Sequence, residues 1–175
     1  ALGSEWLAES YAQQSERHLE EALAAARRAT QQSPQFGAAW VRLAELEFGF
    51  GHNPEAERAL PTALALSPRH ALAHTLQGFQ FCVRNDVERA IEAFKRALAL
   101  DPGHGNAWLG RGLCQIRQGK IREGLSDLEV AAAVEPQRAL FRSYLGKAFA
   151  SNGDLTRARG ELEHAKGMDP GDPTA

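Results

Sequence analysis

The chain has 175 residues, which is enough to bury one core or to stack several small units, and its length does not require two domains. Its 20 basic and 22 acidic side chains give a formal charge of −2, so no bulk electric field favours binding to nucleic acid or to an anionic membrane. No apolar run reaches the ~20 residues of a membrane-spanning helix, so we expect no direct membrane insertion.

Helix-forming residues dominate the composition, whereas the β-branched residues that favour strands are scarce. The predicted fold class is therefore all-α. The chain begins at Ala1 without the basic and apolar segments of a secretion signal, and we interpret this start as a cut inside a longer protein or a cloning scar. The alanine- and arginine-rich composition resembles that of bacterial proteins, with cytoplasm and periplasm both open.

Prolines mark an internal repeat along the whole chain. Five of the eight prolines follow one another at intervals of 34 residues, at Pro34, Pro68, Pro102, Pro136 and Pro170. A fixed period of this length is typical of proteins built from stacked copies of one small unit. Starting a new unit three residues after each proline gives five units, 3–36, 37–70, 71–104, 105–138 and 139–172.

The same columns of these units hold the same kinds of residue. The fourth position is aromatic or basic, at Trp6, Trp40, His74, Trp108 and Arg142. The eighth position is small, at Ser10, Ala44, Gly78, Gly112 and Gly146. The twenty-seventh position is alanine, at Ala29, Ala63, Ala97, Ala131 and Ala165. Small side chains at fixed positions allow two helices to approach closely, so these columns predict tight helix–helix packing in every unit.

Each unit is expected to form two helices joined by a turn. In 88–100 apolar residues recur at three- and four-residue spacing, which predicts one face of an α-helix that ends before Pro102. Along the chain, mid-unit turns are predicted at residues that tolerate turn conformations, namely Gly51, Asn85-Asp86, Gly119 and Asn152-Gly153-Asp154.

This pattern resembles the tetratricopeptide repeat (TPR) family. The third unit matches the family pattern best, at Gly78, Phe81, Ala90, Phe94, Ala97 and Pro102. The resemblance covers essentially the whole chain and implies one TPR domain over 1–175, an α-α superhelix of about ten antiparallel helices. Pro173-Thr174-Ala175 would open a sixth unit, so we expect the natural protein to continue, with the apolar stripe of 155–167 partly uncovered and available for self-association.

Motifs for catalysis or cofactor binding are not found in the sequence, so we predict that the protein is not an enzyme and holds no cofactor or metal. Gly103-His104-Gly105 is interpreted as a turn between repeats, and Gly110-Arg111-Gly112 as part of a helix. His70 and His74 have the four-residue spacing of a zinc site, but we interpret them as structural. Cys82 and Cys114 are interpreted as buried, reduced thiols, with a disulfide or redox role as the alternative.

In the TPR family the first helices line a concave face, and the resemblance implies that five positions of each unit point into it. The residues predicted to bind a partner on this face are Tyr11, Glu45, Phe48, Thr75, Phe79, Val83, Asn106, Leu109, Leu113, Ile116, Arg117 and Lys147. Phe79, Val83, Leu109, Leu113 and Ile116 would form an apolar patch typical of an interaction site, although any one of them could instead pack in the core.

The leading functional hypothesis is a non-catalytic scaffold that binds a peptide or helix of a protein partner in the concave groove. The alternative is an architectural or spacer module that mainly self-associates within a larger protein. One subgroup of the family holds peptide carboxylates with a clamp of lysine, asparagine and arginine. We predict no such clamp here, because the corresponding pairs are Leu7 with Tyr11, Val41 with Glu45, and Thr75 with Phe79.

Overall fold

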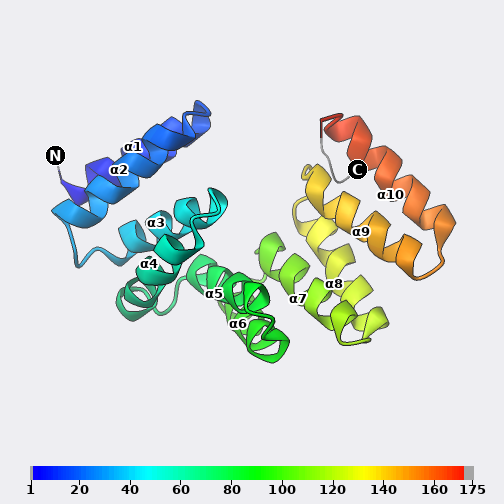
Figure 1. Ribbon diagram of the computed structural model, residues 1–175. Helices are drawn as coiled ribbons and strands as arrows, with labels where there is room; N and C mark the ends of the chain where they lie inside the picture. Colours follow the sequence, from blue (N-terminus) through cyan, green and yellow to red (C-terminus); the bar gives the residue numbers. More distant parts are fainter. Residues whose placement is uncertain (1, 172–175) are drawn as a thin grey trace. The chain divides into compact units, whose positions relative to one another are not determined.

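The computed structural model describes residues 2–171, and this part of the chain consists of helices and turns without a strand, which confirms the all-α fold (Figure 1). The helices are α1 (Gly3–Ser15), α2 (Leu19–Gln32), α3 (Gly37–Gly49), α4 (Asn53–Leu66), α5 (Ala71–Val83), α6 (Val87–Leu100), α7 (Gly105–Arg117), α8 (Ile121–Val134), α9 (Ala139–Ser151) and α10 (Leu155–Met168). Each predicted unit begins at the first residue of an odd-numbered helix. Asp172 and the start of the expected sixth unit lie outside the described residues.

The turn inside each repeat depends on one residue with a left-handed backbone conformation. It is the fifteenth residue of every repeat, at Arg17, Gly51, Asn85, Gly119 and Gly153, with φ between 60° and 84°. Left-handed geometry is strained for a residue with a Cβ, and glycine adopts it most easily. The four turns predicted from turn-forming residues are confirmed, whereas the turn at Arg17 had no such signal in the sequence.

The turn between repeats is stabilised by the backbone and by the fourth residue of the next repeat. Even-numbered helices stop two residues before the repeat proline, and their C-cap N–H groups donate to the alanine of the twenty-seventh position, as Ser33 does to Ala29 (3.0 Å). The indole N–H of Trp40 donates to the Pro34 carbonyl (2.8 Å), and that of Trp108 to the Pro102 carbonyl (2.7 Å). The recurring spacing of tryptophan and proline therefore has a direct hydrogen-bonding cause.

The described chain divides into two compact units, Ala1–Gln80 and Phe81–Ala175, which we call the N-terminal and the C-terminal unit. The boundary falls within α5. The core of the N-terminal unit includes Leu43, Leu46, Leu60 and Leu76, and Trp40 packs against it. In the C-terminal unit the core includes Leu125, Leu128, Phe141, Leu145 and Phe149.

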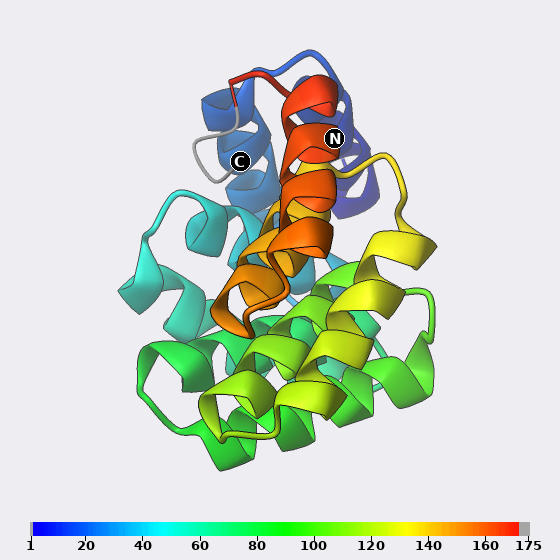
Figure 2. The ribbon, with the colours of Figure 1, turned by 90° about the vertical axis from the view of Figure 1, so that its right-hand side faces the viewer.

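Within the units, α1 and α2, α3 and α4, α7 and α8, and α9 and α10 pack as pairs, and Figure 2 shows α9 and α10 side by side and antiparallel. The repeated alanines Ala29, Ala63, Ala97, Ala131 and Ala165 are all fully buried, which confirms their predicted packing role. At Gly112 and Gly124 the backbones of α7 and α8 nearly touch, since a Cβ on Gly124 would lie 2.6 Å from the Gly112 carbonyl oxygen. The small positions of the repeat thus set the distance between its two helices.

Candidate functional site

The first helices of the N-terminal unit bring four of the predicted partner-binding residues to a part-exposed surface. Tyr11 lies on α1, Glu45 and Phe48 on α3, and Phe79 on α5. The rings of Phe48 and Phe79 stack with their centroids 6.0 Å apart. We call these four residues the first-helix face of the N-terminal unit.

Arg42 is buried beneath this face and contacts two of its residues, Tyr11 and Glu45. The sequence alone does not single it out. Its guanidinium is fully buried, and Nε and Nη2 donate to the Ser10 hydroxyl (2.9 Å) and the Ser10 carbonyl (3.1 Å). Nη1 pairs with the carboxylate of Glu45 at 2.8 Å. The guanidinium carbon also lies 4.3 Å from the centroid of the Tyr11 ring, a cation–π arrangement. One buried cation therefore fixes a tyrosine and a glutamate on two neighbouring helices.

The Tyr11 hydroxyl is protonated at neutral pH, because a phenol has an ordinary pKa of about 10 and its surroundings raise that pKa further. Burial raises the pKa of Tyr11, and the Glu45 carboxylate raises it further, although Arg42 acts in the opposite direction. A protonated phenol both donates and accepts a hydrogen bond, while the Glu45 carboxylate only accepts. The polar groups of this surface can thus recognise amides or a basic side chain.

A cleft of about 240 Å³ opens beside Glu45. It is lined by Gln14, Leu19, Glu45, Leu46, Gly49 and Phe50, which come from the ends of α1 and α3 and the start of α2. Leu19 is 46% exposed, which is high for a leucine. The volume lies below the roughly 300–1,000 Å³ of pockets that hold small molecules or cofactors. The cleft is instead of the size that one or two apolar side chains of a peptide would fill.

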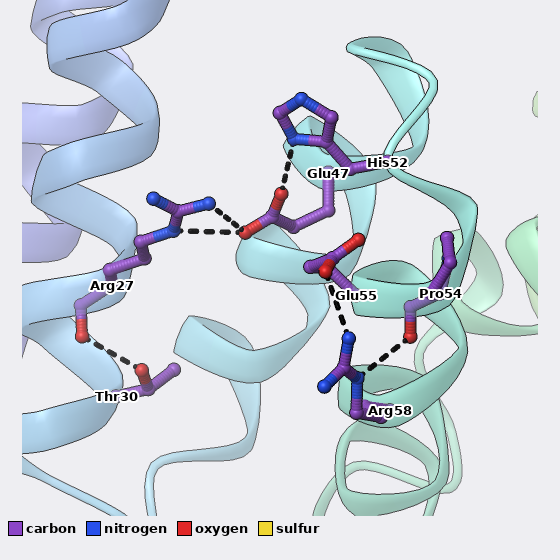
Figure 3. A network of polar contacts seen from close by, with 7 residues as sticks. All are labelled: Arg27, Thr30, Glu47, His52, Pro54, Glu55 and Arg58. Atoms are coloured by element: carbon purple, nitrogen blue, oxygen red, sulfur yellow. Dashed lines mark hydrogen bonds and ion pairs between the residues drawn. The ribbon is translucent and has the colours of Figure 1, made fainter.

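A separate polar network joins α2, α3 and the residue before α4 (Figure 3). Glu47 is almost fully buried, and one oxygen of its carboxylate accepts from Nε and Nη2 of Arg27 at 2.9 and 2.8 Å. The other oxygen lies 2.8 Å from Nδ1 of His52, which must carry the proton because an ionised carboxylate only accepts. Both oxygens are occupied within the protein, so this buried acid serves to connect two repeats.

Seven further candidates lie in the C-terminal unit and differ widely in exposure. Val83, Arg117 and Lys147 are exposed, and Asn106 is half-buried. Leu113 and Ile116 pack against the core of the unit. The structure thus leaves mainly charged or isolated side chains free in this unit.

Two candidates are buried, Thr75 in the N-terminal unit and Leu109 in the C-terminal unit. The Thr75 hydroxyl donates to the Ala71 carbonyl on its own helix (3.1 Å), and Leu109 belongs to the same core cluster as Phe141. Both residues are therefore covered within their units, Thr75 by its burial and Leu109 by its place in the core cluster.

Sequence reasoning missed Arg42 and Leu19, and one of them had a usable signal. Ser10 and Arg42 are separated by 32 residues, two fewer than the repeat length, and they contact each other between successive first helices. Residues at this separation could therefore have been tested as contact pairs. Leu19 had only its apolar character at the start of a helix, which does not predict a cleft.

Family comparison agrees with the repeat geometry. One tetratricopeptide repeat model matches residues 14–78, and a second matches residues 83–123 and 115–173. The chain belongs to the tetratricopeptide repeat family. The matches extend over both units, and the described residues contain the helices α1 to α10 that the TPR resemblance implied.

Individual relatives share part of the sequence or the fold. The TPR chain is 23% identical over 137 residues to anaphase-promoting complex subunit 3 of Schizosaccharomyces pombe, a match that covers 78% of this chain and 21% of that protein. It therefore spans about a fifth of the length of this relative.

Two solved structures show the same fold at low sequence identity. A thermophilic TPR protein of Thermus thermophilus gives a TM-score of 0.81 at 22% identity, covering 97% of this chain and 93% of that one. The anaphase-promoting complex hetero-tetramer Cut9-Hcn1 gives a TM-score of 0.87 at 20% identity, covering 98% of this chain and 34% of that one.

Metal-ligating side chains do not gather in the described part of the TPR fold. Within residues 2–171, no group of three or more metal-ligating side chains is arranged to hold an ion. Of the pair His70 and His74, His74 has a structural role. Its Nε2 donates to the Pro68 carbonyl (2.8 Å), the same bond that the tryptophan indole makes in other repeats. Burial lowers the pKa of His70, its neighbour in the sequence pattern. None of the helices in this part of the chain combines the length and apolar character needed to cross a bilayer.

Proposed function

We propose that this TPR protein is a non-catalytic scaffold that binds a peptide or helix of a protein partner on the first-helix face of its N-terminal unit. The observation that carries the proposal is the cleft beside Glu45, lined in part by the exposed Leu19. Tyr11 and Glu45 are held by the buried Arg42 on the same face, so their positions are set before a ligand arrives. Preorganised polar groups beside an apolar cleft are typical of recognition sites.

The chemistry of the face suggests the kind of peptide that it binds. An apolar side chain would fill the cleft, and a basic side chain or backbone amides would donate to Glu45. Burying two such apolar groups contributes roughly 3–6 kcal/mol before the cost of ordering the peptide, which corresponds to micromolar affinity when the polar contacts are added. The names of two similar proteins support a protein partner, because one is a subunit of the anaphase-promoting complex and the other forms a hetero-tetramer.

Selection of peptides from a random library tests this proposal and does not require a known partner. Random peptides displayed on phage would be selected on the 175-residue chain, and their dissociation constants measured by fluorescence anisotropy. Leu19→Glu places a charge in the cleft, and we expect it to weaken binding about tenfold or more. Leu155→Glu is the matched control, since Leu155 occupies the same repeat position at the start of α10 and is 69% exposed.

Each outcome decides the proposal. Selected peptides that lose affinity for the Leu19→Glu protein and keep it for the Leu155→Glu protein support the proposed face. Equal affinity for the wild-type and Leu19→Glu proteins would refute it, as would a selection that yields no specific binder. Circular dichroism of both variants checks that the helices are intact.

The exposed Leu155 also favours a second candidate, self-association through the last repeat. Only Ala158 and Ala165 are buried on α10, so this helix presents most of its surface to solvent. If Leu155 makes the contact, light scattering will show a mass that rises with protein concentration for the wild type and stays monomeric for the Leu155→Glu protein. A monomer at every concentration for both proteins would exclude this candidate.

A further inference from the structure

Two cysteines that the proposed function does not use lie in contact within the C-terminal unit. Cys82 is the penultimate residue of α5, and Cys114 lies on α7. Their Sγ atoms are 3.3 Å apart, close enough for a hydrogen bond between the thiols. Cys82 is half-buried, whereas Cys114 is only 4% exposed. The predicted burial is therefore confirmed for Cys114 and wrong for Cys82, and the contact makes the two free thiols a pair.

We propose that Cys82 and Cys114 form a redox modification site that closes to an intramolecular disulfide by exchange with a small-molecule disulfide. The sulfurs must move from 3.3 Å to the bonding distance of about 2.05 Å, a closure of little more than about 1 Å. The two cysteines are separated by 32 residues, as are Ser10 and Arg42, so their contact follows from the spacing of successive first helices.

The surroundings make the two thiols unequal. The hydrogen bond with Cys114 lowers the pKa of Cys82, and the positive charge of Arg117 lowers it further, against the effect of burial. The same hydrogen bond and burial raise the pKa of Cys114. The thiolate is the nucleophile in exchange reactions, so the more exposed Cys82 reacts first and Cys114 completes the bond.

The reaction proceeds in two balanced steps. The Cys82 thiolate attacks one sulfur of the external disulfide, forms a mixed disulfide and releases one small thiolate. Cys114 then loses its proton to solvent and attacks the Cys82 sulfur, which expels the second small thiolate. The two protein thiols are oxidised to one disulfide, the external disulfide is reduced to two thiols, and the two protons lost by the cysteines neutralise the released thiolates.

The bond would act on a surface that includes two predicted partner-binding residues. Val83 follows Cys82 directly in the sequence and is exposed, and Arg117 lies one helical turn after Cys114. The disulfide ties the last turn of α5 to α7. It also constrains the unfolded chain, so the oxidised protein should unfold at a higher temperature than the reduced protein.

Glutathione buffers of graded oxidation state, with intact-mass analysis after acid quenching, test the proposal on the 175-residue chain. We expect the wild type to lose two hydrogen atoms and its free thiols together, without a stable glutathione adduct. The Cys114→Ser protein should stop at one glutathione adduct on Cys82. The Cys82→Ser protein should stay unmodified while folded and react after denaturation, because Cys114 is buried.

Three results would overturn the proposal. They are free thiols that persist in the wild type in the most oxidising buffer, a wild type that accumulates the same adduct as the Cys114→Ser protein, and disulfides that link two chains. Reduction by dithiothreitol must return the original mass. Thermal unfolding before and after oxidation provides an independent readout, in which the cross-link should raise the unfolding temperature.

Discussion

The N-terminal and C-terminal units use the same spacing between first helices for different chemistry. In the N-terminal unit, Ser10 and Arg42 are separated by 32 positions. Ser10 accepts from the buried guanidinium of Arg42, which also contacts Tyr11 and Glu45. In the C-terminal unit, residues at the same separation are Cys82 and Cys114, and they bring two thiols together. The small residues and the prolines of the repeat determine which positions of neighbouring helices are in contact. They do not determine which side chains occupy those positions.

Arginine–carboxylate pairs give a second contrast between the units. Arg42 pairs with Glu45, whose side chain is 32% exposed, and with neutral groups of Ser10. Arg111 makes a bidentate pair with Asp127 at 2.7 and 2.8 Å, and the side chain of Asp127 is only 8% exposed. In the N-terminal pair the arginine is the more buried member, since the Arg42 side chain is 0% exposed and the Glu45 side chain is 32% exposed. In the C-terminal pair the carboxylate is the more buried member, since the Arg111 side chain is 18% exposed and the Asp127 side chain is 8% exposed.

The largest effect is expected when these arginines are removed. Arg111→Met leaves the buried Asp127 carboxylate without its partner and should cost about 3–5 kcal/mol of unfolding free energy. Arg42→Met leaves neutral groups and a part-exposed Glu45, so we expect about 1–3 kcal/mol. Urea unfolding followed by circular dichroism measures both. If Arg42→Met proves the more costly, the exposure of the arginine and not that of its partner decides the cost.

The close approach of α7 and α8 predicts that a family-typical residue will be harmful in the C-terminal unit. Gly124 stands where other repeats have alanine, and Gly124→Ala would press a methyl group against the Gly112 carbonyl. We expect a loss of about 1–3 kcal/mol. Gly160→Ala on α10 is the matched control, because no atom lies within 4 Å of its added Cβ, and it should stabilise by about 0.5–1 kcal/mol. Stabilisation by both substitutions would contradict the tight approach of these helices.

Substitutions at the left-handed turn residue should change the unfolding free energy by a smaller amount, with opposite signs in the two units. Arg17→Gly relieves a φ of 66° in the N-terminal unit and should stabilise by about 0.5–1 kcal/mol. Gly119→Ala introduces the same strain at φ 80° in the C-terminal unit and should destabilise by about 1 kcal/mol. Thermal unfolding of both variants shows whether each one is more or less stable than the wild type. A change in the same direction for both would contradict the shared turn geometry.

The smallest effect is expected at a helix cap of the C-terminal unit. The Asp154 side chain accepts from the backbone N–H of Arg157 (3.1 Å) at the start of α10, and this bond, followed by the side-chain bond from Arg157, lowers the pKa of Asp154. A lowered folded-state pKa stabilises above the unfolded value of about 3.9, and the stabilisation is lost as the pH falls through the folded value.

Asp154→Ala should therefore lower the unfolding temperature by a few degrees at neutral pH and leave it unchanged in strong acid. Lys120 occupies the same repeat position before α8 and makes no side-chain cap. Lys120→Asp should gain what Asp154→Ala loses, at neutral pH only. A pH-independent difference for either protein would rule out the charged cap as its cause.

Much of the fold could be predicted from the sequence because packing imposes a strict period. The repeat prolines, the small eighth residue and the buried alanine mark the ends and contacts of every hairpin. The turn at Arg17 could not be predicted, since the surrounding packing forces an arginine into a conformation that its own preference opposes.

The candidate site was less predictable, since assigning a residue to a helix face does not determine how far it is buried. Tyr11 is exposed and Phe48 is part-exposed while packing against the core, whereas Thr75 and Leu109 are buried inside their units. The Arg42 network and the cleft beside Leu19 depend on side-chain conformations of several helices together. No single position in the sequence carries that information.

The most direct test of the proposed binding face is an amide NMR titration of the protein with a selected peptide. We predict that chemical shifts change at Tyr11, Leu19, Glu45 and Gly49, which surround the cleft, and that amides of α8 and α10 stay unaffected. Shift changes confined to α8 and α10, with none around the cleft, would contradict partner binding on the first-helix face of the N-terminal unit.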